Sequence, residues 1–261
     1  MRMAKVKPAI QVRSHLISVV VALLLLCVLV VPIQAWASRI EFTDDLGKGV
    51  SFAEPPKRVV SLVPSITEIM FALGAGEHLQ GLTMHSTLPA EVHDKAIVGS
   101  FFCPCMERIK TLNPDVVMAS ILHDAVREEF AGSDVQVVTL KTESIADSFE
   151  EIRLLGRMFD RENEARSIVE EIQNQLDLIQ DKVARIPESK RKRVIRLMGR
   201  DRVMTPGQDS FQTELIRLAG GIPPRLGKDG EIVPVTREEW QDFDPQVIYG
   251  CGGDREVAER F

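Results

Sequence analysis

Short runs of apolar residues alternate with amphipathic segments along most of this chain. The apolar runs stand at residues 59–62, 97–98, 116–119 and 135–140, and again at 194–198 and 247–249. Runs of this length, rich in β-branched residues and separated by stretches with helical periodicity, are typical of strands in a sheet that helices cover. The pattern predicts an α/β protein with parallel sheets.

The segment after the first apolar run carries signals for the start and the end of a helix. Ser65 and Glu68 have the spacing of a capping box, in which each side chain bonds the backbone N–H of the other residue. Gly74 is the residue type at which helices commonly end. We expect a helix that Ser65 opens and Gly74 closes, and a structural role for Glu68.

One amphipathic segment, at residues 162–185, is much longer than the others. Its apolar residues recur at spacings of three and four, so they form one stripe along a helix: Ile168, Ile172, Leu176, Ile179 and Val183. Such a helix is about 36 Å long at roughly 1.5 Å per residue. It has no Gly/Ser-rich hinge, and we therefore expect a stiff strut.

The chain also contains an internal repeat. The sequence KRVVSL at 57–62 recurs as KRVIRL at 192–197, and TEIMFALG at 67–74 recurs as TELIRLAG at 213–220. Glu107 precedes PDVV at 114–117 by seven residues, and Glu238 precedes PQVI at 245–248 by the same seven. Three matches in one order predict two similar lobes. We expect an N-terminal lobe at 38–143, a helical linker at 144–187 and a C-terminal lobe at 188–261.

Residues 1–37 have the pattern of a secretory signal peptide. A basic start without acidic residues leads into the almost wholly apolar run Leu16–Val31, and Ala35-Trp36-Ala37 supplies the small residues of a cleavage site. The run is shorter than the roughly 20 residues that span a bilayer. Cys27 follows Leu24-Leu25-Leu26, which lacks the small residues that lipoprotein processing prefers. We expect cleavage after Ala37, export to the periplasm and no lipid anchor on Cys27.

Charge excludes one class of partner. Cleavage after Ala37 removes four basic and no acidic residues, which leaves 28 basic against 38 acidic side chains and a net charge of −10. A chain this acidic is repelled by nucleic acid, and no basic, aromatic-rich patch opposes that conclusion. We expect no nucleic-acid partner.

Three cysteines remain in the expected mature chain: Cys103, Cys105 and Cys251. An odd number in an oxidising compartment leaves at least one thiol unpaired or shared with a ligand. A disulfide between Cys103 and Cys105 would close a very small, strained loop. Both stand just before a helical segment, whose N-terminus favours the thiolate. The three thiols could bind a metal ion, contact a ligand or line a pocket.

Several segments together resemble a known family. KRVVSLVPSITE at 57–68, GLT at 81–83, VG at 98–99, MERI at 106–109 and NPDVV at 113–117 are similar to the helical-backbone substrate-binding proteins of ABC importers. Members of that family capture cobalamin, ferric siderophores or haem in the periplasm. The likeness, from about Ile40 to the C-terminus, implies two α/β lobes joined by one long helix, with the ligand between them. The family's second lobe normally continues beyond the point that corresponds to Phe261, so we expect that this chain either is a fragment or has an incomplete second lobe, which would leave a sheet edge exposed.

The resemblance also implies partners and site residues. The family docks onto arginines of the permease through one exposed glutamate on each lobe, and the matching residues here are Glu107 and Glu238. The permease works with a separate ATPase, and the chain itself needs no cofactor beyond the metal chelate that it carries. In open parallel sheets a ligand contacts the loops at the carboxyl ends of the strands. The expected ligand-binding residues are Met84, His85, Phe101, Phe102, Cys103, Cys105, His123, Arg200, Arg202 and Cys251.

Individual roles within this set differ. Phe101 matches an aromatic residue that packs on the corrin ring in cobalamin-binding relatives, and Phe102 is expected to share that role. His85 and His123 are candidates for axial metal contacts, although an isolated histidine is more often a surface or hydrogen-bonded residue. Arg200 and Arg202 could pair with ligand carboxylates or be solvated charges.

Two alternative functions use the same residues. A chelatase-like enzyme would employ the histidines and thiols as metal ligands and proton acceptors. A soft-metal-binding protein would hold its ion with Cys103, Cys105 and Cys251. The sequence has no Walker A, H-E-x-x-H or G-x-S-x-G motif, so it shows no signature of an ATPase, a zinc protease or an α/β-hydrolase.

Overall fold

The computed structural model of this chain describes residues 39–199 and 202–250. The predicted signal peptide, Cys27, Arg200 and Cys251 lie outside the described residues. Within those residues no helix has both the length and the apolar character that crossing a membrane requires.

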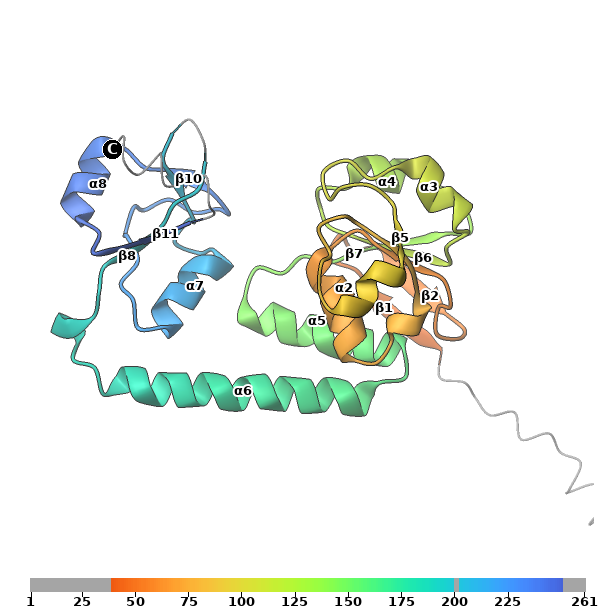
Figure 1. The fold of residues 1–261 in the computed structure, drawn as a ribbon, viewed down its shortest axis with the longest axis horizontal. Coiled ribbons are helices and arrows are strands. Elements are labelled where there is room, and N and C mark those ends of the chain that lie inside the picture. The colour runs from red at the N-terminus through yellow and green to blue at the C-terminus, as the bar shows by residue number, and fades with distance from the viewer. Residues whose placement is uncertain (1–38, 200–201, 251–261) are drawn as a thin grey trace, which may run out of the picture. The chain divides into compact units, whose positions relative to one another are not determined.

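The first lobe is built on a five-stranded parallel sheet (Figure 1). Its strands are β3 (Val59–Ser61), β4 (Leu79–Leu82), β5 (Ala96–Ile97), β6 (Val116–Ala119) and β7 (Gln136–Thr139). Their order across the sheet is β5-β4-β3-β6-β7, and every neighbouring pair is parallel. The chain runs outward from β3 through β4 to β5 and then returns to add β6 and β7 on the other side. This reversal places a topological switch point between β3 and β6.

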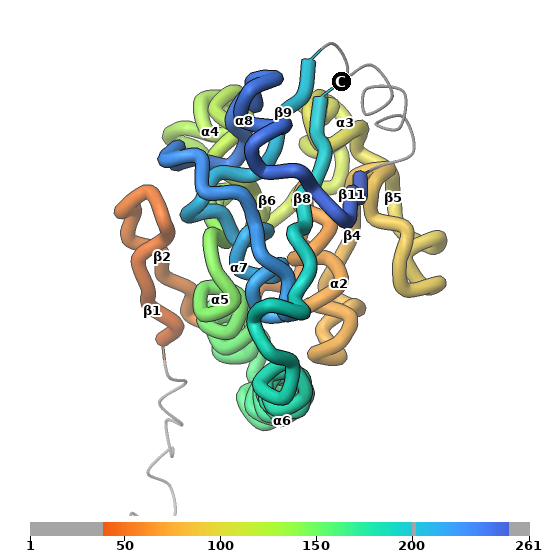
Figure 2. Tube along the Cα trace, turned by 90° about the vertical axis from the view of Figure 1, so that its left-hand side faces the viewer, coloured from red at the N-terminus to blue at the C-terminus, as the bar shows by residue number. Residues whose placement is uncertain are grey.

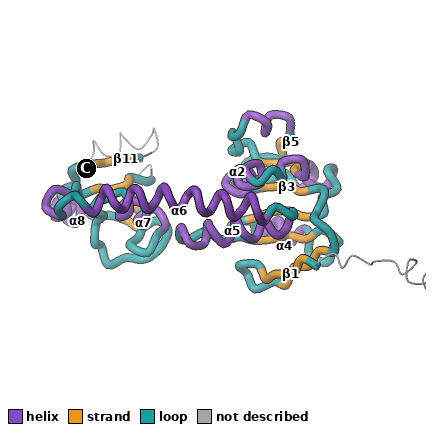
Figure 3. Tube along the Cα trace, turned by 90° about the horizontal axis from the view of Figure 1, so that it is seen from below, coloured by secondary structure: helices purple, strands orange, loops and turns teal. Residues whose placement is uncertain are grey.

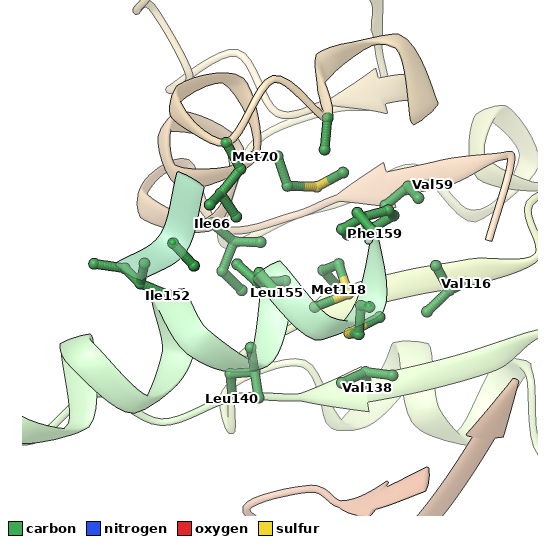
Figure 4. Close-up of a cluster of buried hydrophobic side chains, with 14 of the residues drawn as sticks. Val59, Ile66, Met70, Val116, Met118, Val138, Leu140, Ile152, Leu155 and Phe159 are labelled. Atoms are coloured by element: carbon green, nitrogen blue, oxygen red, sulfur yellow. The ribbon is translucent and has the colours of Figure 1, made fainter. Parts of the chain in front are cut away.

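Alternate residues of these strands face opposite sides of the sheet, and helices bury both sides. On one side the strands meet α2 (Pro64–Ala72) and α5 (Ile145–Met158), as Figure 4 shows. The residues that this sheet contributes to the cluster are Val59, Leu79, Val116, Met118 and Val138. On the other side Val60, Val117, Ala119 and Val137 pack with residues of α3 (Met106–Thr111) and α4 (Asp124–Glu129). Burial on both sides explains why the strands appear in the sequence as continuous apolar runs.

A hairpin and two short 3₁₀ turns complete this lobe. Strands β1 (Ile40–Thr43) and β2 (Gly49–Phe52) pair antiparallel, and η1 (Gly76–His78) and η2 (Ala90–Asp94) precede β4 and β5. The carboxylate of Asp44 accepts hydrogen bonds from the backbone N–H groups of Leu46, Lys48 and Thr139. The turn of the hairpin is thereby joined to β7.

The predicted capping box at the start of α2 is wrong. The N-cap is Val63, two residues before Ser65, and it has no side-chain hydrogen bond; the helix begins at Pro64. Proline is favoured in the first turn because its missing N–H and fixed φ suit a helix start. Thr67 instead donates to the hydroxyl of Ser61 at 2.9 Å. The predicted end is confirmed, since Gly74 has a φ of +74° and follows the last turn.

The long helix is confirmed as α6 (Glu162–Ala184), with 23 residues and a length of about 34 Å. It packs beside α5, as the end-on view in Figure 2 and the view from below in Figure 3 show. A Cβ on Gly156 of α5 would lie 2.6 Å from the Cβ of Ala165, so glycine is required for this close approach. Ala165 and Val169 are buried, whereas Leu178 and Ile179 farther along are exposed.

The described part of the second lobe, residues 188–199 and 202–250, contains two strand pairs and two α-helices. After η3 (Glu188–Lys190) come β8 (Val194–Arg196), β9 (Met204–Thr205), α7 (Phe211–Leu218), β10 (Val233–Pro234), α8 (Arg237–Phe243) and β11 (Val247–Tyr249). Strands β8 and β11 form the expected parallel pair, while the antiparallel pair β9–β10 was not predicted. Ile195, Leu197, Val203 and Val235 form the small buried cluster. All three residues of β11 are exposed.

The internal repeat is visible as one arginine contact that occurs in both lobes. Arg58 donates through Nε to the carbonyl oxygen of Asn113, and its Nη2 lies 2.5 Å from Oδ1 of Asp115. Arg193 donates through Nε to the carbonyl oxygen of Asp244 at 2.7 Å, and its Nη2 lies 2.6 Å from Oδ2 of the same residue. Each arginine therefore joins the start of a strand to the turn that follows α3 or α8.

Candidate ligand-binding site

The loops that follow β4, β5 and β6 meet at the carboxyl edge of the first sheet, next to the switch point. Met84 and His85 follow β4, residues 98–105 follow β5, and residues 120–123 follow β6. Backbone bonds hold the loops together: Met84 N–H donates to the carbonyl oxygen of Gly99 at 2.9 Å. The predicted first-lobe site residues are thus brought into one loop cluster.

Phe101 is held from two sides within this cluster. Its backbone N–H donates to Nδ1 of His85 at 3.1 Å. Its carbonyl oxygen lies 2.7 Å from Nε2 of His123. The Phe101 ring also contacts the ring of His123, with centroids 4.9 Å apart and planes at 64°. Both the backbone and the ring of this aromatic residue are therefore fixed by histidines from neighbouring loops.

Phe102 presents a large apolar side chain to solvent. It is 81% exposed and meets Phe101 edge-on, with ring centroids 4.9 Å apart and planes at 87°. We refer to Phe101 and Phe102 as the aromatic platform. Met84 and Leu122, from the adjacent loops, are exposed as well. Apolar side chains that are exposed together on one loop cluster indicate a binding surface for a ligand or a partner protein.

The two histidines have defined proton positions in their neutral form. The N–H of Ser120 donates to Nδ1 of His123 at 3.0 Å, so the ring proton is on Nε2 and is donated to Phe101. His123 is 3% exposed, and burial lowers the pKa of its imidazole. With both nitrogens engaged, the predicted axial metal contact of His123 does not fit this geometry.

His85 differs from His123 in being exposed. Its Nδ1 accepts the Phe101 N–H, which places the proton of the neutral ring on Nε2. A histidine that ligates a metal through Nε2 normally donates from Nδ1. A metal contact by His85 would therefore require its bond to Phe101 to break.

The two cysteines lie on a tight turn between β5 and α3. The N–H of Ser100 donates to the carbonyl oxygen of Cys103 at 3.2 Å. The N–H of Cys105 donates to the carbonyl oxygen of Val98 at 2.7 Å. Gly99 has a φ of +116°, and a Cβ there would lie 2.7 Å from the Cys103 oxygen, so this turn requires glycine. Cys103 is exposed, Cys105 is half-buried, and both thiols are free.

The predicted metal role of the thiols remains a prediction. In the part of the chain that the structure describes, no three His, Cys, Asp or Glu residues are grouped as metal ligands. Cys251 lies outside that part, as does Arg200. Arg202 is exposed in the loop between β8 and β9.

Glu107 and Glu238 occupy equivalent places in the two lobes. Each lies in the first turn of its helix, α3 or α8, and each is exposed. The side chain of Glu107 is 85% exposed and lies 3.7 Å from the ammonium group of Lys110. Exposure makes both carboxylates accessible to a partner, and the helix N-terminus stabilises their charge.

Sequence reasoning missed the polar groups that support the site. Ser120, three residues before His123, donates the N–H that sets the histidine tautomer. A serine followed by a histidine at the end of an apolar run could have signalled such a local side-chain-to-backbone turn. A buried chain of hydroxyls from Ser86 through Thr67 to Ser61, beneath the switch point, was also missed.

The chain has a doubly wound α/β lobe with exposed loops at its carboxyl edge, then a long helix and a second α/β lobe. This arrangement defines a class of solute-binding proteins. The family model described as "Periplasmic binding protein" matches residues 59–260. The chain belongs to this family.

Individual relatives agree with the assignment. The uncharacterized ABC transporter substrate-binding lipoprotein YvrC of Bacillus subtilis (strain 168) is 29% identical over 222 residues, which cover 82% of this chain and 70% of YvrC. A vitamin B12-binding protein of Yersinia pestis (strain Pestoides F) is 25% identical over 209 residues, which cover 78% of this chain and 73% of that protein. The crystal structure of an ABC transporter substrate-binding protein from Listeria monocytogenes EGD-e is 30% identical, with a TM-score of 0.66 and coverage of 80% of each chain.

The family assignment decides between the functional classes. It confirms the predicted resemblance and makes the chain an extracytoplasmic substrate-binding protein of the ABC transporter class rather than an enzyme. The chelatase-like alternative is therefore wrong. YvrC is a lipoprotein, so the absence of a lipid anchor on Cys27 stays a prediction.

Proposed function

We propose that this protein captures a metal chelate on the aromatic platform of its first lobe and delivers the chelate to the permease of an ABC importer. The observation that carries the proposal is the exposed ring of Phe102, set edge-on against Phe101, whose backbone is hydrogen-bonded on both sides. The chain itself needs no cofactor, because the ligand brings its own metal.

The chemistry of the platform favours a large, partly planar ligand. An aromatic ring gains from contact with a flat or apolar surface without demanding one hydrogen-bond pattern. The exposed side chains of Met84 and Leu122 extend the apolar surface around it. Cobalamin, haem and ferric siderophores all combine such surfaces with a bound metal, and the Yersinia relative is named for binding vitamin B12.

Ligand titration tests the capture step. Purified protein is titrated with cyanocobalamin, hemin and ferrichrome, and we expect micromolar or tighter binding of one of them. Phe102→Ala should weaken that binding by about tenfold to a hundredfold, since burying a large apolar side chain contributes roughly 1.5–3 kcal/mol. Leu178→Ala, which removes another exposed apolar side chain, 60% exposed on α6, is the control and should leave binding unchanged. Failure of the wild type to bind any of the three would contradict the proposal.

Delivery is proposed to use Glu107 and Glu238. Both are exposed carboxylates at helix starts, at positions that the internal repeat relates. Arginines of the permease are suitable partners, because their planar guanidinium groups bind carboxylates with two parallel hydrogen bonds.

An ATPase assay in liposomes tests the docking step. We expect Glu107→Ala and Glu238→Ala each to reduce the stimulation of ATPase activity in liposomes that contain the permease–ATPase complex, and the double variant to abolish it. Glu68→Ala on α2 and Asp242→Ala on α8 remove other exposed carboxylates and should have no effect. Equal effects of the control and test variants would show that only net charge matters.

Elemental analysis tests the remaining role of the thiols. If Cys103, Cys105 and Cys251 hold a soft metal ion, protein purified without oxygen should contain that metal before any chelate is added. Metal-free protein would contradict that role.

A further inference from the structure

A buried imidazole connects two of the loops that form the candidate site. His123 is the N-cap residue of α4 and follows β6, whereas Phe101 belongs to the loop after β5. The contacts of His123 with Phe101 are the 2.7 Å bond from Nε2 to the carbonyl oxygen and the edge contact of the two rings. One side chain thus determines both where the Phe101 backbone lies and how its ring is oriented.

The other ring nitrogen of His123 holds its own loop. Nδ1 accepts the Ser120 N–H at 3.0 Å and lies 3.3 Å from the Ser120 hydroxyl. Arg127 fixes the same loop from α4, donating to the carbonyl oxygens of Ser120 and Ile121 at 2.9 Å each. The loop after β6 is therefore a rigid support, and Nε2 of His123 extends from it to the platform.

The electrostatic surroundings keep this imidazole neutral. Burial lowers its pKa, the carbonyl of Phe101 opposes that shift, and the charge of Arg127 adds to it. Asp124 pairs with Arg127, and His85 reaches the site through the backbone of Phe101. A protonated ring would direct a second N–H toward the Ser120 N–H, so only the neutral ring can make both bonds.

We infer that His123 is a positioning residue for ligand capture: it sets Phe101 in place for the ligand and does not touch the ligand or its metal. This inference rests on the proposed function of the aromatic platform. It also assigns to His123 a role that differs from the axial metal contact expected from the sequence.

Two conservative variants separate the two bonds of the ring. In His123→Gln the terminal amide reaches the position of Nε2 and can still donate to Phe101, but the bond to Ser120 is lost. In His123→Asn the side-chain oxygen takes the position of Nδ1 and keeps the bond to Ser120, but nothing reaches Phe101. The positioning role predicts that Gln retains binding and Asn loses it, whereas a role confined to the loop after β6 predicts the opposite order.

The experiment measures the affinity of each variant for cyanocobalamin, hemin and ferrichrome. For the probe that binds the wild type, we expect His123→Gln to remain within about threefold and His123→Asn to bind about tenfold more weakly, the effect of one lost hydrogen bond. In a Phe101→Ala background, His123→Asn should cause no further loss, because its effect acts through Phe101. Additive losses, or an Asn variant that binds better than the Gln variant, would overturn the inference.

A measurement without ligand keeps this test separate from the proposed function. Nuclear Overhauser contacts between residue 123 and the Phe101 ring, and hydrogen exchange of residues 99–105, report the position of the platform in each variant. We expect wild-type contacts and exchange in His123→Gln, and lost contacts with faster exchange in His123→Asn. If none of the three probes binds the wild type, the proposed function fails, and these spectra alone decide the inference. Unchanged spectra in the Asn variant would overturn it, and thermal melting of each variant identifies any that fails to fold.

Discussion

The two lobes contain the same helix–turn–strand unit in different surroundings. In the first lobe, α3 leads to β6, which has β3 on one side and β7 on the other, and all four residues of β6 are buried. In the second lobe, α8 leads to β11, which pairs with β8 and exposes all three of its residues. The turn between helix and strand is nevertheless held by an arginine in both. Local sequence therefore determines the unit, while neighbouring elements determine how much the unit contributes to stability.

The largest expected difference between the lobes is in how much strands β6 and β11 contribute to the free energy of unfolding. Val117 and Ile248 occupy equivalent positions in the repeat, but Val117 is fully buried and Ile248 is 44% exposed. Val117→Ala should lower the free energy of unfolding by about 2 kcal/mol, because it removes buried methyl groups and leaves a cavity. Ile248→Ala should cost less than about 1 kcal/mol. Urea denaturation followed by circular dichroism measures both, and equal losses would contradict the comparison.

The arginine contacts should contribute equally to the free energy of unfolding in the two lobes. Arg58→Ala and Arg193→Ala each remove bonds to a backbone carbonyl and to a carboxylate. We expect each to cost about 1 kcal/mol, given the partial exposure of both side chains. Lysine variants serve as controls, since they keep the charge without the forked geometry and should recover only part of the loss. A much larger loss for one arginine would show that the two contacts are not equivalent.

The starts of the two helices differ in how they are capped. Thr236 and Glu239 form a complete capping box on α8, whereas the N-cap of α3, Cys105, makes no side-chain bond. Thr236→Ala should therefore cost roughly 0.5–1 kcal/mol, and Cys105→Ser should stabilise the first lobe by a few tenths of a kcal/mol. Thermal unfolding by differential scanning calorimetry can detect both changes. If Thr236→Ala left the melting temperature unchanged, the capping box would have no energetic role.

The smallest expected effects on stability depend on pH. They have opposite signs for two carboxyl groups, those of Glu151 and Glu239. Burial raises the pKa of Glu151 on α5 above its ordinary value of 4.5, so its contribution to stability is complete below pH 4.5 and is lost as the pH rises through the raised pKa. The Lys228 hydrogen bond lowers the pKa of Glu239 on α8 below 4.5, so its contribution is present above pH 4.5 and is lost as the pH falls through the lowered value.

Glutamine variants of the two residues isolate these contributions. Glu151→Gln should be more stable than the wild type at pH 7, and this advantage should disappear as the pH falls to 4.5. Glu239→Gln should be less stable at pH 7, and its deficit should disappear only below pH 4.5. Urea denaturation across this pH range measures both differences, and a difference that does not vary with pH would contradict the assigned shifts.

Much of the fold could be predicted because its signals are long or repeated. The run at 116–119 and the stripe from Ile168 to Val183 gave β6 and α6 nearly to the residue. The start of α2 was misassigned because Ser65 and Glu68 have capping-box spacing, while Pro64 one residue earlier favours its own helix start. Strands β9 and β10 were missed because two residues cannot show a period.

The candidate site was less predictable than the fold. The sequence identified the aromatic and histidine residues of the first-lobe loops, but the bonds between them depend on which loops lie side by side. Phe101 and His123 are 22 residues apart, and their 2.7 Å contact joins the loop after β5 to that after β6. Since these strands lie on opposite sides of β3 and β4, strand order along the chain could not reveal the contact.

The arginine contacts also bear on how such a chain could have diverged from a duplicated ancestor. Arg58 pairs with a carboxylate one residue after Pro114, and Arg193 with a carboxylate one residue before Pro245. On the other side of each proline stands an amide, Asn113 in the first lobe and Gln246 in the second. Each proline is therefore flanked by one acid and one amide. Descent from a common half would therefore require the acid to move across the proline. An intermediate with acids at both positions would have kept the arginine paired at every step, which makes the exchange a path of compensated single substitutions.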